Sequence, residues 1–220
     1  MAKVMIFAGG FGSGKTELAI NFALARSRYA DEVVLADLDL ANPYYASAEM
    51  RDLLESAGIR LLSHAGLPSA DDLPSIPEEI VEILRGSSEV LIDVAGDEMG
   101  ALVLEYLSRY LKERECLFYL VLNPFCLSDQ DFASMPELRY LLESAAGLNL
   151  TGLISNPNLR NETSPDMIRN GHRMVLDRAK SLRLPVAFIT AENKFYNELV
   201  AEYGAKLQGI TLYLKPEWLQ

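Results

Sequence analysis

The segment Gly-Gly-Phe-Gly-Ser-Gly-Lys-Thr at residues 9–16 constrains the fold of this chain more than any other feature. It fits the pattern G-x-x-x-x-G-K-[ST], comes after an apolar run and opens a segment of helical periodicity. Glycines let successive backbone N–H groups converge on phosphate oxygens, and the helix N-terminus adds partial positive charge. The motif predicts a nucleoside phosphate site in which Lys15 reaches the β- and γ-phosphates and the Thr16 hydroxyl ligates Mg²⁺.

Short apolar runs alternate with longer segments of helical periodicity over the rest of the chain. The predicted strands are residues 4–8, 32–36, 60–63, 90–93, 117–122, 151–155, 186–190 and 211–214. The predicted helices are residues 15–28, 48–57, 77–85, 100–113, 136–146, 165–182 and 193–207. Continuous apolar strands joined by helices indicate an α/β fold with a doubly wound, mostly parallel sheet and helices on both faces. We expect residues 1–220 to form a single domain.

Carboxylates lie directly after two of these strands. Asp37 and Asp39 end the second strand, and Asp93 ends the fourth, with Gly96 three residues later. Open α/β sheets place their ligands at the carboxyl ends of the strands, and a crowded carboxylate pair needs a cation such as Mg²⁺. We expect Asp93 to contact Mg²⁺ through a water molecule and the Gly96 N–H to meet the terminal phosphate. For Asp97 and Glu98, the simpler interpretation is that they complement the dipole of the next helix.

These segments together resemble the MinD/ParA/nitrogenase-iron-protein group of P-loop ATPases, the SIMIBI class. The resemblance rests on G-G-F-G-S-G-K-T, D-L-D-L-A-N-P and I-D-V-A-G, and on the later strand ends L-V-L-N-P-F and L-I-S-N-P-N-L. It implies a P-loop NTPase sheet of seven or eight strands, bound ATP or ADP, and a homodimer that sandwiches the nucleotide.

The resemblance also implies roles for individual residues. Asp39 best matches the aspartate that positions the attacking water, and Asp37 lies nearer the metal, although the two could be exchanged. Asn156 would contact the base. The predicted catalytic residues are therefore Asp39 and Lys15, and the predicted metal ligands are Thr16, Asp37 and Asp93. The predicted nucleotide-binding residues are Gly10, Phe11, Gly12, Ser13, Gly14, Lys15, Thr16, Glu17, Gly96, Asn156 and Pro157.

One position departs from the family pattern. Most MinD and ParA proteins carry a second lysine four residues before the glycine of G-K-[ST], and Gly10 stands there in this chain. In the family that lysine reaches the partner subunit's phosphates, so its absence predicts slow hydrolysis unless another cation, such as Arg160 or Arg51, replaces it. The CobQ-like and dethiobiotin-synthetase-like branches, which lack the sandwich, stay open.

The residues directly after the sixth strand predict which base is bound. A guanine site of the usual type uses N-K-x-D, in which the aspartate accepts both guanine N–H groups. The chain has Asn-Pro-Asn-Leu at residues 156–159, without the lysine and the aspartate. This favours adenine.

Charge and composition exclude several classes of partner. Lys plus Arg is 20 and Asp plus Glu is 31, so the net charge of −11 disfavours nucleic acid. No apolar run is long enough to span a membrane, and the amphipathic segment 193–207 carries Glu198 and Glu202, the wrong sign for an anionic membrane surface. Cys116 and Cys126 are better explained by packing than by an iron–sulfur cluster. We expect a cytoplasmic protein.

Three hypotheses on function remain. The first is a slow Mg²⁺-dependent ATPase that acts as a nucleotide switch for an unidentified protein partner. The second is an ATP-dependent small-molecule kinase or ligase, whose pocket would draw on the loop 65–77 and the polar stretch 156–163. The third is an ATP-binding scaffold without hydrolysis. The first is favoured.

Overall fold

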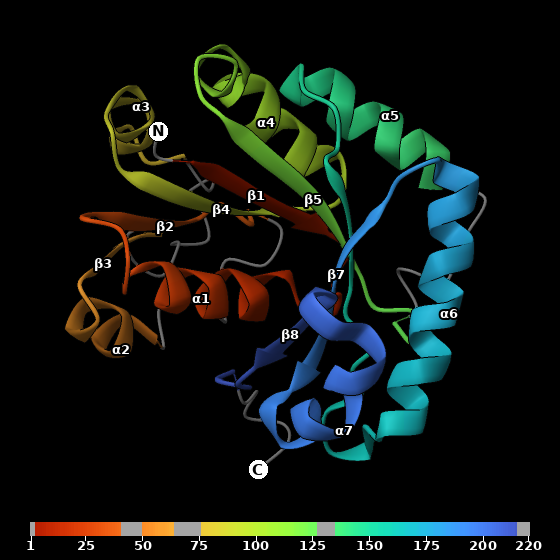
Figure 1. Cartoon of the computed structure of the whole chain (residues 1–220). Helices are drawn as coiled ribbons and strands as arrows, with labels where there is room; N and C mark the ends of the chain where they lie inside the picture. Colours follow the sequence, from red (N-terminus) through yellow and green to blue (C-terminus); the bar gives the residue numbers. More distant parts are fainter. Residues whose placement is uncertain (1–2, 41–49, 64–75, 127–134, 215–220) are drawn as a thin grey trace, which may run out of the picture.

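The centre of the computed structural model, which describes residues 3–40, 50–63, 76–126 and 135–214, is an eight-stranded sheet (Figure 1). Its strand order is β3-β2-β4-β1-β5-β6-β7-β8, and every neighbouring pair is parallel. The strands are β1 (Val4–Gly9), β2 (Val33–Asp37), β3 (Ile59–Leu62), β4 (Glu89–Ala95), β5 (Cys116–Leu122), β6 (Gly152–Ser155), β7 (Val186–Glu192) and β8 (Leu207–Ile210).

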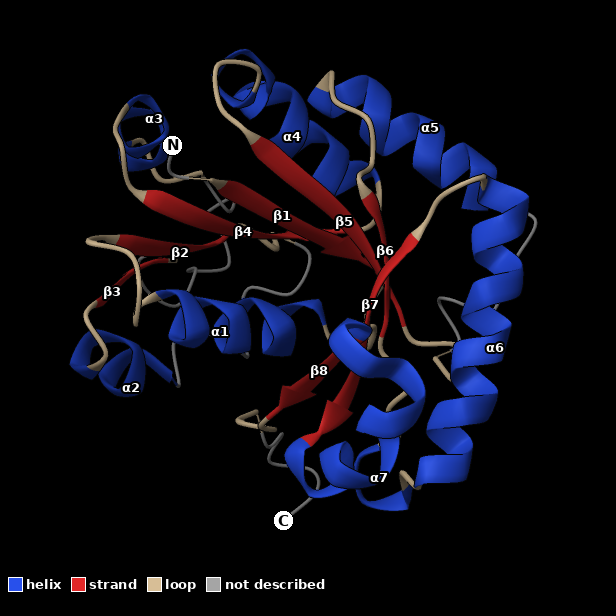
Figure 2. Ribbon diagram, viewed as in Figure 1, coloured by secondary structure: helices blue, strands red, loops and turns tan. Residues whose placement is uncertain are grey.

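Helices cover both faces of this sheet (Figure 2). They are α1 (Lys15–Arg26), α2 (Arg51–Ser56), α3 (Glu79–Arg85), α4 (Glu98–Leu111), α5 (Met135–Ala146), α6 (Pro165–Leu182) and α7 (Asn193–Tyr203), with short 3₁₀ turns η3 (Arg160–Glu162) and η4 (Gly204–Lys206). Helices α3 to α6 pack on one face, and α1 and α2 pack on the other. The predicted doubly wound α/β fold is confirmed, with all eight strands parallel.

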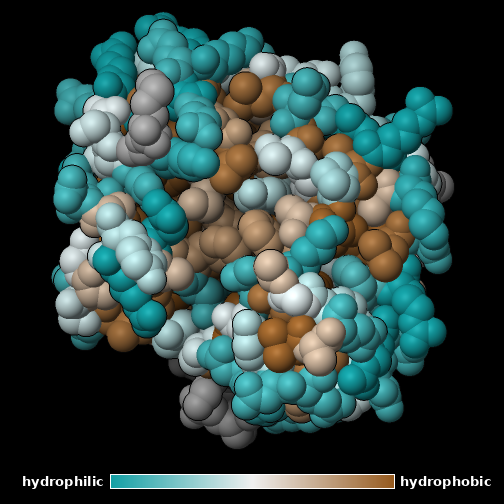
Figure 3. All heavy atoms as spheres, in the orientation of Figure 1, coloured by the Kyte–Doolittle hydropathy of each residue, from teal (hydrophilic) through white to brown (hydrophobic). Residues whose placement is uncertain are grey.

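Strand β1 shows why the strand sequences are apolar at every position. Val4 and Ile6 belong to the core beneath α3 to α6, whereas Met5 and Phe7 belong to the core beneath α1 and α2. Successive side chains of a strand point to opposite faces, so a strand covered on both sides needs apolar residues at every position. On the face shown in Figure 3, hydrophobic side chains gather toward the middle and hydrophilic ones dominate the rim. No helix within the described ranges is both long and apolar enough to cross a bilayer.

The structure of residues 203–214 differs from the sequence prediction. The last strand is β8, Leu207–Ile210, paired with β7, and residues 211–214 are not a strand. The helix predicted over residues 193–207 ends at Tyr203, because Gly204 takes a positive φ of 54° and begins a 3₁₀ turn. Backbone groups of residues 211–214 bond to side chains instead of to a neighbouring strand.

Helix α4 begins two residues earlier than predicted. Asp97 is its N-cap and accepts hydrogen bonds from Met99 N (2.9 Å) and Gly100 N (3.1 Å), and Glu98 occupies the first turn. The structural interpretation of these two acids is therefore confirmed.

Candidate nucleotide-binding site

The phosphate loop connects β1 directly to α1, as the motif requires. Strand β1 ends at Gly9 and α1 begins at Lys15. Gly14 caps the helix with a φ of 86°, a left-handed conformation that favours glycine. Glycine is also required at position 14 for steric reasons, because a Cβ there would lie 2.2 Å from Nδ2 of Asn156. That nitrogen donates to the carbonyl of Ser13 (2.7 Å), so a side chain from the end of β6 supports the loop.

Three carboxylates meet the loop lysine at the carboxyl edge of the sheet. Nζ of Lys15 lies 2.7 Å from Oδ2 of Asp39, and the two residues are only 5% and 4% exposed. Asp37 accepts a hydrogen bond from Asp39 N (3.3 Å) and stands opposite Asp93 in the register of β2 and β4. The structure thus brings together four residues that the sequence assigned to catalysis and metal binding.

Asp93 is the least satisfied member of this group. It is fully buried, and neither carboxyl oxygen has a hydrogen bond of good geometry to any described residue. Burial raises the pKa of Asp93 well above its usual range, while Lys15 and the adjacent Thr16 oppose the shift. Burial also acts to lower the pKa of Lys15, but Asp93, Asp39 and Asp37 outweigh it, so the net shift is upward and Lys15 stays charged.

The side-chain oxygens at this edge fit Mg²⁺. Hard cations take carboxylate and hydroxyl oxygens, and Mg²⁺ keeps several waters and substrate phosphates in its shell. The unsatisfied oxygens of Asp93, with Thr16 and Asp37 beside them, offer such ligands. Among the described residues, no group of three or more His, Cys, Asp or Glu could hold a metal by itself.

Gly96 lies directly against the loop. A Cβ at this position would stand 2.5 Å from the carbonyl carbon of Gly9 and 2.9 Å from the nitrogen of Gly10. Only glycine allows the end of β4 to approach the loop so closely. The contact of the Gly96 N–H with the terminal phosphate stays a prediction.

Two supporting residues on the neighbouring segment were not predicted. Nδ2 of Asn123, just after β5, donates to the carbonyls of Gly12 (3.3 Å) and Asn158 (2.8 Å). Sγ of Cys126 donates to the carbonyl of Phe11 (2.9 Å). The sequence signal that could have found Asn123 is a polar residue after an apolar strand, at the edge that carries the carboxylates.

Three further residues predicted to bind nucleotide differ in their exposure and contacts. Phe11 is 71% exposed at the turn of the loop. Pro157 is buried against α6, where a Cβ on Gly171 would lie 2.5 Å from it. The side chain of Asn156 is engaged at both ends, because its Oδ1 accepts from the Thr190 hydroxyl (2.7 Å). The base contact assigned to Asn156 stays a prediction.

Glu17 accepts hydrogen bonds from the backbone of Tyr213 and Leu214. Its Oε1 accepts from Tyr213 N (2.7 Å) and its Oε2 from Leu214 N (3.1 Å). Burial raises the pKa of Glu17, while those two N–H groups and Arg160 oppose the shift. We call residues 211–214 the C-terminal strap, because side chains of α1 form hydrogen bonds with its backbone.

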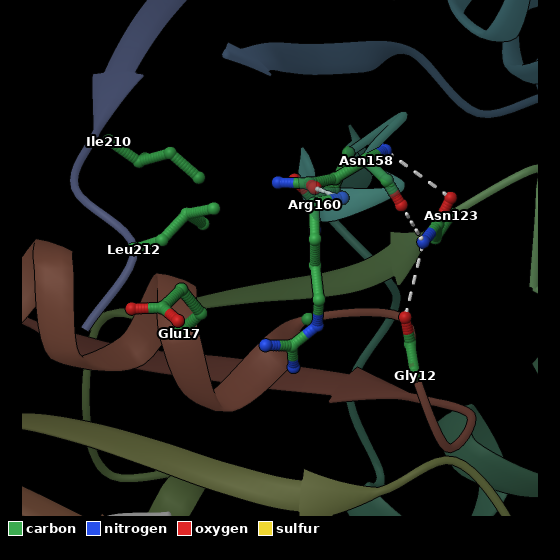
Figure 4. A pocket seen from close by; sticks show the side chains of 9 residues that line it. Gly12, Glu17, Asn123, Asn158, Arg160, Ile210 and Leu212 are labelled. Carbon is green, nitrogen blue, oxygen red and sulfur yellow. Dashed lines mark hydrogen bonds between the residues drawn. The ribbon is translucent and has the colours of Figure 1, made fainter. Parts of the chain in front are cut away.

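A pocket lies between the phosphate loop and the strap (Figure 4). Gly12 and Gly14 line it on the loop side, and Ile210 and Leu212 line it on the opposite side. Arg160, one of the two cations considered as replacements for the second lysine, also lines it. The other, Arg51, is hydrogen-bonded to Ser63 and Glu55 on the surface.

Comparisons with known proteins identify the fold. No protein-family model matches the sequence, and no curated protein sequence matches it. Solved structures do match. They include cell division protein FtsY from Thermotoga maritima (20% identity, TM-score 0.55, covering 87% of this chain and 62% of FtsY). The septum site-determining protein MinD complexed with Mg-ADP from Pyrococcus horikoshii OT3 matches at 18% identity and TM-score 0.55 over 90% of this chain and 84% of MinD. A ParA family ATPase from Chlorobium tepidum TLS matches at 17% identity and TM-score 0.52 over 93% and 94%.

The extent of these matches differs. The chain spans less than two thirds of the FtsY structure but most of the MinD and ParA structures. At these identities the likeness concerns the fold, and it agrees with the resemblance drawn from the strand-end motifs. The chain has the P-loop NTPase fold shared by MinD, ParA and FtsY.

Proposed function

We propose that the chain binds ATP with Mg²⁺, hydrolyses it slowly and acts as a nucleotide-dependent switch for a protein partner. The observation that carries this proposal is the buried pair of Lys15 and Asp39 beside the unsatisfied Asp93. Three carboxylates around one buried lysine leave excess negative charge in the fold, which is costly unless a bound cation uses it.

The pair suggests an exchange of partners. When phosphate oxygens occupy the loop, the Lys15 side chain would turn from Asp39 toward them. Its ammonium group lies at the N-terminus of α1, where anions bind. The ion pair of Asp39 with Lys15 would then open, and the Asp39 carboxylate could accept a hydrogen bond from another group. Mg²⁺, when bound, would neutralise phosphate charge near Thr16, Asp37 and Asp93.

Hydrolysis would use that released carboxylate. Asp39 would accept a hydrogen bond from the attacking water and orient it toward the γ-phosphate, while the Gly96 N–H would contact the terminal phosphate. We expect slow turnover because Gly10 occupies the position of the family's second lysine. Relaxation of the segments after Asp39 and Gly96 would report the nucleotide state.

The switch proposal includes a nucleotide-dependent homodimer. Phe11, exposed at the turn of the phosphate loop, would meet a second copy or a partner protein there. The tyrosines at positions 44 and 45, considered as contacts from the sequence, lie outside the described residues.

The kinase or ligase hypothesis stays second. Most of the loop 65–77 lies outside the described residues. In the polar stretch 156–163, Asn158 Oδ1 accepts from Arg160 N (2.6 Å) and from the Thr163 hydroxyl (3.2 Å), so these groups bind one another. No feature of the described structure favours a second substrate.

Two measurements test the proposal. Calorimetry should show Mg²⁺-dependent ATP binding, and light scattering should show a larger mass with Mg²⁺ and a non-hydrolysable ATP analogue than with ADP or no nucleotide. Absence of nucleotide binding would refute the whole proposal. Binding with an unchanged mass would refute the switch by dimerisation and favour a scaffold or a small-molecule enzyme.

A further inference from the structure

A set of buried polar side chains, which we call the polar file, leads from α6 to the phosphate loop. Its members, each at most 9% exposed, are His172, Ser155, Thr190, Asn156 and Ser13. Nδ1 of His172 lies 3.1 Å from the hydroxyl oxygen of Ser155, the last residue of β6. The Thr190 hydroxyl, on β7, donates to Oδ1 of Asn156 (2.7 Å) and to the Ser155 carbonyl (3.3 Å). Nδ2 of Asn156 donates to the Ser13 carbonyl (2.7 Å), so the polar file ends in the loop itself.

The polar file begins where α6 packs beside α7, in surroundings that disfavour a charged ring (Figure 1). The His172 ring meets that of Tyr203 edge-on, with 5.2 Å between the ring centroids. Burial is the main cause that lowers the pKa of His172, Lys206 of η4 lowers it further, and Glu202 of α7 opposes both. His172 is therefore uncharged at neutral pH and gains a proton in the acidic range.

Other charged residues on the elements around this ring already have partners. Four ion pairs occupy them: Arg169 of α6 with Asp166 (2.9 Å), with Glu198 (3.2 Å) and with Glu202 (3.0 Å), and Lys194 with Glu192 of β7 (2.8 Å). Arg173, next to His172 in sequence, also acts on Glu202. Strand β6 carries no charged residue. Glu202, the carboxylate that favours a charged His172, is thus already shared with two arginines.

Protonation of His172 would reverse the first link of the polar file. An uncharged imidazole accepts at one nitrogen, so the Ser155 hydroxyl can donate to Nδ1. An imidazolium carries hydrogen on both nitrogens, so Nδ1 must then donate, and the Ser155 hydroxyl hydrogen loses its acceptor. Because Ser155 is fully buried, that hydrogen cannot turn to water, and leaving it unpaired is costly. A shift of Ser155 that relieves this cost would also displace the next residue, Asn156, which holds the loop.

We propose that His172 is a positioning residue for the phosphate loop and that its protonation weakens nucleotide binding through Ser155 and Asn156. This inference rests on the proposed function. If the uncharged form of His172 holds the loop, nucleotide binding favours that form. By linkage, nucleotide affinity then falls as the pH drops below about 6.5, and binding in that range releases protons from His172.

The test compares the wild type with His172→Asn, whose amide can contact the Ser155 hydroxyl but does not titrate. Calorimetry measures binding of Mg²⁺·ATP and of Mg²⁺·tripolyphosphate, which has the phosphates but no base, at pH 7.5 and pH 5.5. Titration of the ligand affects both proteins equally, so the informative quantity is the ratio of wild-type to variant affinity. We expect this ratio to fall by roughly 3- to 10-fold at the lower pH for both ligands.

A second measurement avoids the lower pH. At pH 6.5, calorimetry in two buffers of different ionisation enthalpy gives the number of protons released on binding, and the wild type should release more than His172→Asn. A purely structural role of His172 would weaken binding equally at every pH. It would therefore change neither the ratio nor the proton release.

Two further variants locate the coupling. Ser155→Ala removes the first link and leaves His172 in place, so its affinity for both ligands should follow pH as that of His172→Asn does. His64→Asn replaces the other histidine of the chain and should keep the wild-type dependence.

Each alternative has its own outcome. A constant affinity ratio together with equal proton release would overturn the role of His172. A pH effect on ATP that is absent with tripolyphosphate would show that the coupling reaches the base and not the loop, which also contradicts the proposal. A pH effect that disappears in His64→Asn would assign the titration to the wrong histidine for this inference. A wild type that binds neither ligand at pH 7.5 would instead defeat the proposed function.

Discussion

The two sides of the candidate site handle buried charge in opposite ways. At the strand edge, Lys15 faces three carboxylates, and Asp93 lacks hydrogen bonds of good geometry to the described residues. At the strap, both Glu17 oxygens accept backbone N–H groups and Arg160 donates to a strap carbonyl. Under the proposed function, Mg²⁺ and phosphate would exchange partners with these strand-edge groups, whereas the strap groups already have protein partners. Substitutions at the two sides should therefore change different quantities.

The largest effect is expected at Lys15. Lys15→Ala removes the charge that faces both the phosphates and the carboxylates, so Mg²⁺·ATP affinity should fall by roughly 100-fold or more. The free energy of unfolding should also fall, by about 3 kcal/mol near neutral pH, because Asp39 and Asp93 lose their buried counter-charge. Calorimetry and urea denaturation measure the two quantities.

Lys3→Ala is the matched control, because Lys3 forms an exposed pair with Glu115. It should leave ATP affinity unchanged and stability within about 0.5 kcal/mol. Tight ATP binding by Lys15→Ala would contradict the assignment of the phosphate loop.

Asp39→Asn separates binding from turnover. The variant frees Lys15 from its ion pair, so ATP binding should be kept or become tighter, while hydrolysis should fall by roughly 100-fold, as for the loss of a residue that orients the nucleophile. Single-turnover hydrolysis and calorimetry on the same preparation measure this split.

Asp37→Asn is the comparison that decides between the two aspartates. If Asp37 ligates the metal, Asp37→Asn should weaken Mg²⁺-dependent ATP binding more strongly than it lowers the rate constant for hydrolysis of bound ATP. If Asp39→Asn hydrolysed ATP at the wild-type rate and Asp37→Asn did not hydrolyse it, Asp37 would be the residue that positions the attacking water and Asp39 the metal ligand.

The contrast between the two sides also explains what the sequence could predict. The phosphate loop, Asp37, Asp39 and Asp93 stand in short motifs at the ends of apolar strands, and a parallel sheet brings such ends to one edge. The strap depends on contacts such as that of Glu17 with Tyr213, 196 residues apart, which leave no local periodicity. Residues 211–214 have the β-forming composition of a strand, so propensity alone predicted one there. Asn123 does have a local signal, since it is a polar residue directly after an apolar strand, but that signal does not identify its partner Gly12, which lies far away in sequence.

A smaller effect is expected at Glu17. Glu17→Gln replaces one accepting oxygen with an N–H₂ group, so one of the two strap N–H groups loses its bond and unfolding should become easier by about 1–2 kcal/mol. Tripolyphosphate affinity should not change, because the carboxylate faces the strap and not the loop. Urea denaturation and calorimetry check both statements, and a loss of tripolyphosphate binding would place Glu17 in the phosphate site after all.

The smallest effect concerns His172. Its Nδ1 lies 3.1 Å from the Ser155 hydroxyl, and its ring meets that of Tyr203 edge-on. Burial lowers the pKa of His172, Lys206 lowers it further, and Glu202 opposes them. The unfolded chain then binds more protons than the folded one between the folded pKa and about 6.5, so stability should fall as the pH drops below about 6.5. His172→Gln should remove this component, and the two unfolding free energies, measured by urea between pH 7.5 and 5, should converge toward low pH. A constant difference between them over that range would show that His172 does not titrate differently in the folded and unfolded states.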